Sequence, residues 1–433
     1  MTTLVILVFI LGYVTIVFEH PLKLDKTVPA LIMGALCWAI ISFGHLQVFD
    51  DSHQAGELSG ILLHHIGKVA EILIFLLGAM TIVELIDLHN GFAVITNRIK
   101  TTSKKTMLWI IVVLAFFLSA TLDNLASTIV LVSLLRRLVP HKEERIWFVC
   151  MAVIGANAGG AWSPIGDVTT TMLWIGNKVS SLGLIEHLVL PSLVCVVLPA
   201  FVASFLKPFQ GKIKLVHGDA GEEAQQEKLL SSKTMLIVGV GALIFVPIFK
   251  GITHLPPYVG MMLGLGVVWL VSEYIHPEED FTNERKHLYS AHTALSRIEL
   301  SSILFFLGIL VAVASLESLG TLLHLAEFLD AKIPNQNLVI LVLGYASAVI
   351  DNVPLVAATM GMYTFPTDSA IWHFIAYSAG TGGSMLIIGS AAGVAAMGME
   401  RIDFLWYLKK VTWLVMIGFL GGAGTFILIS MLF

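Results

Sequence analysis

The stretch Ser-Ala-Thr-Leu-Asp-Asn-Leu-Ala-Ser-Thr at residues 119–128 places an Asp-Asn pair inside an apolar segment. The same pair recurs in Ile-Asp-Asn-Val-Pro at residues 350–354. Each pair is followed by a glycine-rich apolar stretch, at 157–167 and at 380–390. In both stretches a Gly-Gly pair is followed by an Ile-Gly pair at the same spacing. A duplicated polar site in interrupted apolar helices is typical of a secondary transporter.

The composition indicates an all-α polytopic membrane protein, because 57% of the residues are hydrophobic and only 13% are charged. No basic face for nucleic acid is evident, and the three cysteines lie in apolar stretches, which does not indicate a disulfide framework. The run 1–18 has no basic region before it and no small-residue cleavage site after it, so we interpret it as a span rather than a signal peptide. The absence of an Arg- and Ser-rich transit peptide favours a bacterial-type inner (plasma) membrane.

Apolar runs predict the membrane segments of two similar halves. In the first half they lie at 1–18, 27–44, 66–87, 107–120, 123–139, 146–177 (interrupted near Pro164) and 184–206. In the second half they lie at 234–249, 256–275, 298–317, 337–350, 351–364, 370–399 (interrupted) and 404–432. The paired segments that meet at each Asp-Asn have 17 residues or fewer, which is short for a full crossing at 1.5 Å per residue. Each pair is therefore predicted to be a re-entrant hairpin.

Five spans and one hairpin per half predict that the second half is inverted relative to the first. The first repeat would cover 1–206, with a hairpin at about 107–139 and a broken helix at about 146–177. A cytoplasmic linker at 207–233 would precede the second repeat at 234–433, with a hairpin at about 337–364 and a broken helix at about 370–399.

The basic residues predict which side each hairpin faces. Lys and Arg cluster at the base of the first hairpin and in the linker, whereas the base of the second has only Lys332 and the loop 45–65 has none. The positive-inside rule then places the base of the first hairpin in the cytoplasm and both termini outside.

Two amphipathic stretches, 88–100 and 318–330, precede the two hairpins and are predicted to be interfacial helices. Ordinary surface loops are the alternative. The stretch 276–297 is interpreted as a charged loop without a motif.

The acids inside the apolar segments are the candidate functional residues. Asp123 is expected to cap the second helix of its hairpin, but Asn or Ser could also do so without a charge. An ionised Asp at the centre of a membrane helix costs roughly 2.5–3.5 kcal/mol, so we predict a functional role. The predicted Na⁺/H⁺ site of the first half comprises Thr121, Asp123, Asn124, Asn157, Ser163 and Asp167.

A weaker counterpart is predicted in the second half. It comprises Asp351, Asn352, Thr381, Ser384 and Ser390, with Ser347 nearby. Na⁺ takes several oxygen ligands, which carboxylates, amides, hydroxyls and unwound backbone carbonyls supply. A buried carboxyl can hold either a proton or Na⁺, and that competition suffices for exchange. Since Ser390 stands where the first half has Asp167, we expect the first site to dominate.

Other polar residues carry weaker predictions. Glu84 is a further candidate for proton handling, whereas no ligand spacing supports a metal site at His64-His65. The Gly-Gly pairs are consistent with close helix packing, with an unwound backbone, or with both.

The chain resembles NhaD-type sodium/proton antiporters of the ion transporter superfamily. The resemblance rests on the motifs at 119–128, 157–171 and 350–354 and covers nearly the whole chain. It implies inverted repeats, hairpins that meet broken helices, and a homodimer with a fixed scaffold and a moving domain. It also implies ion- or proton-handling roles for a set of matching residues, namely Asp123, Asn124, Asn157, Asp167, Asp351 and Asn352. The Asp-Asn pattern is shared more loosely with arsenite permeases and carboxylate/sodium symporters.

We therefore expect a secondary active transporter, not an enzyme, that exchanges Na⁺ or Li⁺ for H⁺ by alternating access with elevator-like motion. Its partners would be these ions, the lipid bilayer and a second copy of the chain, with no cofactor. The alternatives are a sodium-coupled transporter of a small anion such as a carboxylate, or an arsenite-type permease. An anion site should present a basic group at the hairpin tips, and the tip sequences carry acids without Lys or Arg.

Overall fold

The structure, a computed structural model, describes residues 1–50, 54–213, 229–275, 277, 289–333, 335–349 and 351–432. Within these ranges six helices are long and apolar enough to cross a membrane, and four more apolar helices are shorter. The predicted class of an all-α membrane protein is confirmed. Parts of the predicted linker (214–228) and of the charged loop (276 and 278–288) lie outside the described residues.

In the described part of the first half, the regular elements are mostly helices, with one pair of short strands. Its helices are α1 (Thr2–Val17), α2 (Glu19–Leu22), α3 (Thr27–Phe43), α4 (Leu58–Leu88), α5 (Ala93–Thr96), α6 (Lys104–Leu122), α7 (Asn124–Leu138), α8 (Lys142–Gly160), α9 (Val168–Ile175) and α10 (Ser181–Ala203). The antiparallel strands β1 (Val48–Phe49) and β2 (Ala55–Gly56) precede α4, and a 3-10 turn, η1 (Lys207–Phe209), follows α10.

The second half also contains long helices, a pair of short helices and a broken helix. Its helices are α12 (Ser232–Thr253), α13 (Pro257–Tyr274), α14 (Ala291–Arg297), α15 (Leu300–Ser318), α16 (Thr321–Lys332), α17 (Gln336–Ala346), α18 (Asn352–Met362), α19 (Ala370–Gly382), α20 (Ala391–Glu400), α21 (Phe404–Lys410) and α22 (Thr412–Leu432).

Three of the sequence expectations need correction. Helix α6 has 19 residues, because the Ser103 hydroxyl caps its N-terminus by accepting from the backbone N–H of Thr106. The expectation that every paired segment has 17 residues or fewer is therefore wrong for α6. Helix α4 begins at Leu58, so part of the predicted loop 45–65 is helical.

The third correction concerns the predicted amphipathic helix at 88–100. Only the four residues of α5 are helical after α4 ends, because Asn90 adopts a positive φ of 51° that stops the helix. A helix is present at the matching place in the second half, where α16 covers most of 318–330.

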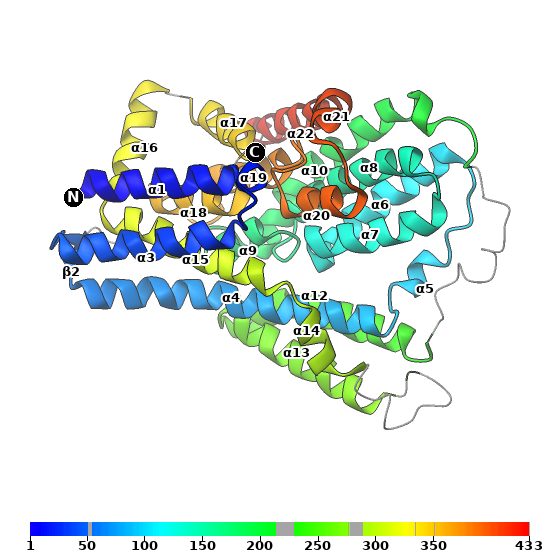
Figure 1. The fold of residues 1–433 in the computed structure, drawn as a ribbon, viewed down its shortest axis with the longest axis horizontal. Helices are drawn as coiled ribbons and strands as arrows, with labels where there is room; N and C mark the ends of the chain where they lie inside the picture. The colour runs from blue at the N-terminus through cyan, green and yellow to red at the C-terminus, as the bar shows by residue number, and fades with distance from the viewer. Residues whose placement is uncertain are drawn as a thin grey trace.

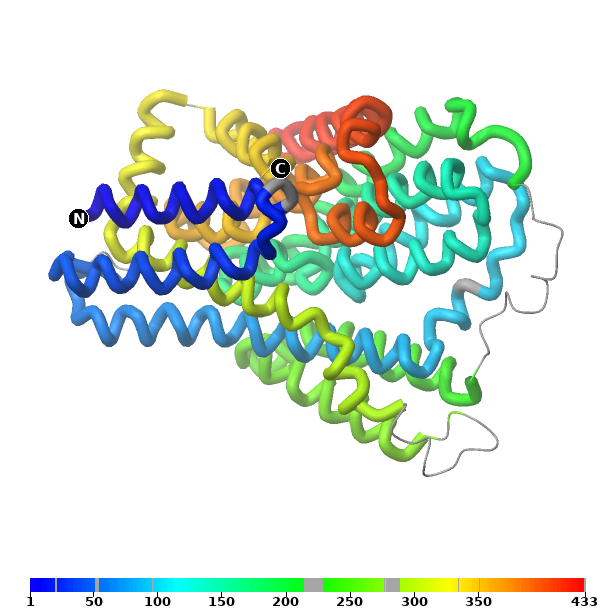
Figure 2. Tube along the Cα trace, viewed as in Figure 1, coloured from blue at the N-terminus to red at the C-terminus, as the bar shows by residue number. Residues whose placement is uncertain are grey.

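The helices pack into two groups, and each group draws on both halves of the chain. The first helix group consists of α1, α3, α4, α12, α13 and α15, and the second consists of α6 to α10, α17 to α20 and α22. Figures 1 and 2 show α4, α12 and α13 along the lower side of the molecule and α6, α7, α8 and α10 at the upper right. The groups meet where α15 packs on α18, α4 on α9 and α12 on α6.

Four helix interruptions lie together in the second helix group. Helices α6 and α7 meet at Asp123, α17 and α18 meet around Asp351, and α8–α9 and α19–α20 are separated by non-helical segments. In Figure 1, α6 and α7 approach the middle of the molecule from the right and α17 and α18 from the left.

Two glycines let these helices come close. A Cβ at Gly159 would lie 2.2 Å from the Phe116 carbonyl oxygen on α6, and a Cβ at Gly382 would lie 2.2 Å from the Gly344 oxygen on α17. Backbone therefore packs against backbone in both places, and since α8 and α19 end within one residue of these glycines, close packing and interruption occur together.

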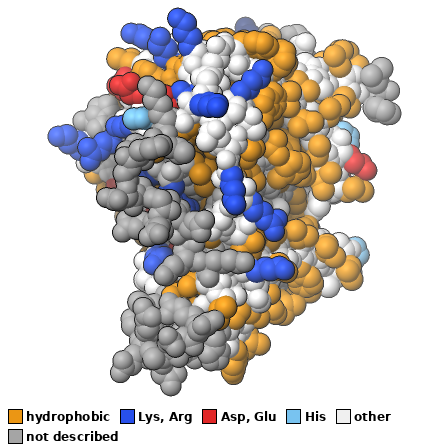
Figure 3. Space-filling model, turned by 90° about the vertical axis from the view of Figure 1, so that its right-hand side faces the viewer, with side chains coloured by type: hydrophobic (Ala, Val, Ile, Leu, Met, Phe, Trp, Pro, Cys, Tyr) orange, Lys and Arg blue, Asp and Glu red, His pale blue; other side chains and the backbone are white. Residues whose placement is uncertain are grey.

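Basic side chains gather at one end of the molecule, here called the basic end. Exposed members include Arg98, Lys100, Lys105, Arg136, Lys142, Lys207 and Lys212. Figure 3, which views the right-hand side of Figure 1, shows Lys and Arg spread over this face with few acids. This is the end that the positive-inside rule assigns to the cytoplasm.

Candidate ion-binding centre

The Asp167 carboxylate lies at the centre of the second helix group. Asp167 is only 1% exposed, and its Oδ1 accepts hydrogen bonds from the backbone N–H of Thr169 at 2.8 Å and from the Thr169 hydroxyl at 2.6 Å. These bonds cap the N-terminus of α9, where the helix dipole favours a negative charge.

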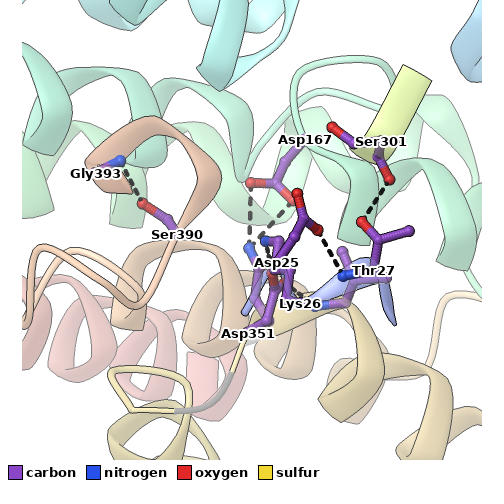
Figure 4. A network of polar contacts seen from close by, with 10 residues as sticks. Asp25, Lys26, Thr27, Asp167, Ser301, Asp351, Ser390 and Gly393 are labelled. Atoms are coloured by element: carbon purple, nitrogen blue, oxygen red, sulfur yellow. Dashed lines mark hydrogen bonds and ion pairs between the residues drawn. The ribbon is translucent and has the colours of Figure 1, made fainter. Parts of the chain in front are cut away.

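Both Asp-Asn pairs contribute their asparagine to this carboxylate. Asn124 Nδ2 donates to Asp167 Oδ2 at 2.5 Å, and Asn352 Nδ2 lies 3.5 Å from each Asp167 oxygen. Figure 4 shows Asp167 facing the Asp351 turn, with dashed lines joining the two regions. One buried carboxylate therefore connects segments that are far apart in the sequence.

Asn157 extends the cluster to the second broken helix. Its Oδ1 accepts from Asn124 Nδ2 at 3.1 Å, and its Nδ2 donates to the hydroxyls of Ser384 at 2.7 Å and Ser390 at 2.9 Å. Six of the predicted site residues are thus brought together: Asn124, Asn157, Asp167, Asn352, Ser384 and Ser390. We call these six residues the polar centre.

The chemistry of the polar centre suits a small hard cation. It offers a carboxylate, amide oxygens and hydroxyls, which are the ligand types that alkali and alkaline-earth ions prefer. The hydrogen bonds to Asp167 come from neutral donors, so the carboxylate retains capacity for a cation or a proton. Within the described ranges no group of three or more His, Cys, Asp or Glu side chains is arranged to hold a metal ion.

Asp123 lies beside this cluster and lines a cavity. Its Oδ1 accepts from the backbone N–H of Ala126 at 2.7 Å, which confirms that it caps α7. Its side chain lines a cavity of about 160 Å³ together with Glu84 and Asp87 of α4, Glu299, and two arginines, Arg137 and Arg297. Asp123 therefore meets a cavity, whereas Asp167 is almost fully buried.

Asp351 has a partner that the sequence pattern does not reveal. Lys26 Nζ lies 3.1 Å from Asp351 Oδ2, across 325 positions of sequence, while Asp351 Oδ1 accepts from the backbone N–H of Val353 at 3.2 Å. The tip sequences carry no Lys or Arg, but in the folded protein Lys26, from the turn between α2 and α3, lies at the second tip.

Four predicted hydroxyls bond to backbone oxygens rather than to the polar centre. Thr121 donates to Leu118 within α6 at 3.0 Å, and Thr381 donates to Tyr377 within α19 at 2.6 Å. The other two join separate segments, Ser163 to the Ala120 oxygen at 2.6 Å and Ser347 to the Ala379 oxygen at 2.8 Å. Thr169, which is not among the predicted site residues, donates a hydrogen bond from its hydroxyl to Asp167.

Comparison with known proteins identifies the family. Residues 13–373 match the family model described as citrate transporter, CitMHS. The chain is 48% identical to sodium/proton antiporter 1 of Arabidopsis thaliana, over 97% of this chain and 71% of that protein. It is 47% identical to sodium/proton antiporter 2 of the same plant, over 97% and 98% of the two chains.

A bacterial relative is more distant. The Na⁺/H⁺ antiporter NhaD of Vibrio cholerae is 30% identical, over 93% of this chain and 87% of that protein. The chain therefore belongs to the citrate transporter family, in one group with the NhaD-type sodium/proton antiporters, and is a multi-pass membrane transporter rather than an enzyme.

Proposed function

We propose that this chain exchanges Na⁺ for H⁺ across the membrane, and that Li⁺ can replace Na⁺. The observation that carries the proposal is the buried Asp167 carboxylate, which neutral donors from both Asp-Asn pairs surround. The names of the plant and bacterial relatives support it.

The proposed exchange is a competition for carboxylates. A protonated carboxyl releases its proton when Na⁺ binds to the same carboxylate, because a bound cation lowers the pKa of the carboxyl. Asp123 and Asp167 would hold the ion or the proton, and the amide oxygens of Asn124 and Asn157 would complete the coordination. Thr121 and Ser163 would join only when their backbone bonds open.

The second half would supply a weaker counterpart. Asp351 and Asn352 would form it with the hydroxyls of Thr381, Ser384 and Ser390, a set with a single acid. The contacts favour an auxiliary role for the second half. Asn352 hydrogen-bonds to Asp167, and Ser384 and Ser390 accept hydrogen bonds from Asn157.

We propose that the transporter consists of two inverted repeats, at 1–206 and 234–433, joined by a cytoplasmic linker at 207–233. The pairs α6/α7 and α17/α18 would be re-entrant hairpins that enter from opposite sides. The first helix group would be a fixed scaffold, also forming a homodimer interface, and the second would move across the membrane as an elevator. The division of the helices into two groups supports this scheme.

The cavity at Asp123 supports a cytoplasm-facing state. It lies beside Arg137 in the last turn of α7, near the basic end. A larger cavity of about 480 Å³ toward the other end is lined by α4, α15 and α18 residues and by none of the Asp-Asn pairs. In a plasma (inner) membrane, the basic end would lie in the cytoplasm and Asp123 would exchange ions with it.

Reconstituted vesicles test the proposal. Purified protein in liposomes that contain a pH-sensitive dye should move protons when a Na⁺ gradient is imposed, and a Li⁺ gradient should do the same. Empty liposomes and a K⁺ gradient of equal size provide the controls. Proton movement that does not depend on Na⁺ or Li⁺ would show that the proposed function is wrong.

Sodium-coupled carboxylate transport is the second candidate, because the family model carries the name citrate transporter. A carboxylate needs a basic group that no acid neutralises. Lys26 at the Asp351 turn is paired with an acid, and Arg137 and Arg297 share the Asp123 cavity with four acids. We therefore expect no Na⁺-stimulated uptake of labelled citrate in the same vesicles. Uptake that rises with Na⁺ would favour this candidate instead.

A further inference from the structure

Lys26 lies in the turn that joins α2 to α3 and reaches the second Asp-Asn pair. Its ammonium contacts Asp351 at 3.1 Å and lies over the Phe305 ring of α15, 4.4 Å from the ring centroid. Its side chain is 22% exposed and that of Asp351 is 15% exposed. The pair is thus largely withdrawn from water, where an ion pair is screened little by salt.

The turn that carries Lys26 is itself held in place. The Asp25 carboxylate accepts from the backbone N–H of Thr27 at 2.8 Å, and the Thr27 hydroxyl donates to the Ser301 carbonyl oxygen at 3.1 Å. Figure 4 shows this chain of contacts from Ser301 through Thr27 to Lys26 and Asp351. Lys26 is therefore presented from the first helix group to an acid of the second.

Lys26 also lies close to the first Asp-Asn pair. A cavity of about 120 Å³ is lined by Lys26, by Leu125 and by Ala391 at the start of α20. Leu125 and Glu299 also line the cavity that contains Asp123. The two cavities are neighbours, so Lys26 stands between the two tips rather than at the periphery.

We propose that Lys26 is a tethered cation that occupies the Asp351 carboxylate, so that the second Asp-Asn pair binds no transported Na⁺ in this conformation. This inference rests on the proposed Na⁺/H⁺ exchange. An ammonium and Na⁺ carry the same charge, and one carboxylate cannot neutralise both at close range. Displacing Lys26 would leave a largely buried ammonium without its carboxylate, which is strongly unfavourable.

The unequal halves agree with this assignment. The predicted site of the first half has two acids, Asp123 and Asp167, whereas that of the second half has Asp351 alone. Ser390 caps α20 where Asp167 caps α9. The second-half site, in which Lys26 pairs with the single acid Asp351, is electrically neutral without a bound ion. The ion pair also joins the two helix groups, so it must break if the second group moves relative to the first.

The test combines Na⁺ binding with stability in the purified full-length protein. The variants are Lys26→Met, Asp351→Asn and the double variant, with Lys26→Arg as the charge-preserving change and the exposed Lys23→Met as the matched control. The amount of radiolabelled Na⁺ bound per protein and the melting temperature in detergent are measured for each.

We expect Asp351→Asn to bind as much Na⁺ per protein as the wild type. We expect each single neutral variant to melt a few degrees lower, and the double variant to regain most of that loss, because it leaves no unpaired charge. Lys26→Arg and Lys23→Met should behave like the wild type.

Either of two results would overturn the inference. One is that Asp351→Asn binds one Na⁺ fewer, which would make Asp351 an occupied site. The other is that the losses of the single variants simply add in the double variant. If the wild type binds and moves no Na⁺, the proposed function fails instead, and the stability measurements still decide whether the ion pair exists.

Discussion

At the scale of single residues, the two acids of the first half differ in their surroundings. Asp123 caps α7 and faces a cavity, whereas Asp167 is buried and receives hydrogen bonds from neutral donors on α7, α9 and α18. Both were predicted from the expense of an intramembrane acid. The sequence does not predict the difference in their surroundings, because that difference depends on how the side chains are oriented in the folded protein.

We predict that Asp167→Asn reduces Na⁺-dependent proton movement by more than about tenfold. The amide keeps the shape but loses the charge, and hydrogen bonds to a charged group contribute about 1.5–3 kcal/mol, where 1.4 kcal/mol is a factor of ten. Proton movement in dye-loaded liposomes measures the effect. Asp403→Asn, at an exposed cap of α21, is the matched control, and equal rates for both variants would contradict a central role for Asp167.

Lys26 shows where residue-level prediction from sequence ends. The sequence carries a recognisable Asp-Asn motif because acids in apolar segments are conspicuous. Nothing in it marks the partner of Asp351, which lies 325 positions away in a turn between apolar helices. Pairing of distant side chains depends on how the helices pack, and apolar periodicity alone does not specify that packing.

At the scale of elements, glycine positions were easier to anticipate than helix lengths. The Gly-Gly pairs suggested close packing or interruption, and the structure has both. The boundaries of α4 and α6 were missed because caps and turns decide them, such as Ser103 before α6. A run of apolar residues predicts the apolar part of a helix, but it does not predict the polar turns that extend the helix at its ends.

Helix contact at Gly159 gives the second prediction. We expect Gly159→Ala to lower the melting temperature in detergent, because the added Cβ would lie 2.2 Å from the Phe116 carbonyl oxygen and overpacking costs about 1–3 kcal/mol. Gly424→Ala, where a Cβ meets nothing within 4 Å, should melt like the wild type. Equal melting temperatures for the two variants would mean that α6 and α8 are not in such close contact.

The ends of three helices meet at Glu400, which gives the third prediction. Its buried carboxylate pairs with Arg136 Nε of α7 at 2.7 Å and with Arg145 Nη2 of α8 at 2.9 Å. Glu400→Gln should destabilise the protein by up to about 3 kcal/mol, since breaking a buried pair costs roughly 3–5 kcal/mol and Arg136 is partly exposed. Thermal unfolding measures this, with the exposed Glu143→Gln as the control, and no difference between them would argue against the three-helix contact.

At the scale of the whole molecule, the sequence predicts a duplication but not how the halves mix. Each helix group takes elements from both halves, and the polar centre joins Asp167 of the first half to Asn352 of the second. A repeat can be read from matching motifs within one chain. Which copies pack together depends on contacts between helices hundreds of residues apart, as between α3 and α15.

The orientation of the whole molecule gives the last prediction. Ser133 lines the cavity that contains Asp123, and Gly60 lines a cavity beside His64 at the other end of α4. Both positions are exposed, whereas the native Cys37, Cys150 and Cys195 are buried and should react slowly with a thiol reagent. Ser133→Cys and Gly60→Cys therefore report the two sides of the membrane.

We expect a membrane-impermeant maleimide to label Ser133→Cys in inside-out vesicles only and Gly60→Cys in right-side-out vesicles only. The physical reason is the excess of Lys and Arg at the basic end, which the positive-inside rule assigns to the cytoplasm. Both variants should label after detergent permeabilisation, and the wild type should label weakly throughout. Labelling of both variants from the same side would contradict the arrangement of α4 across the membrane, and labelling with the sides exchanged would reverse the proposed orientation while leaving the polar centre as described.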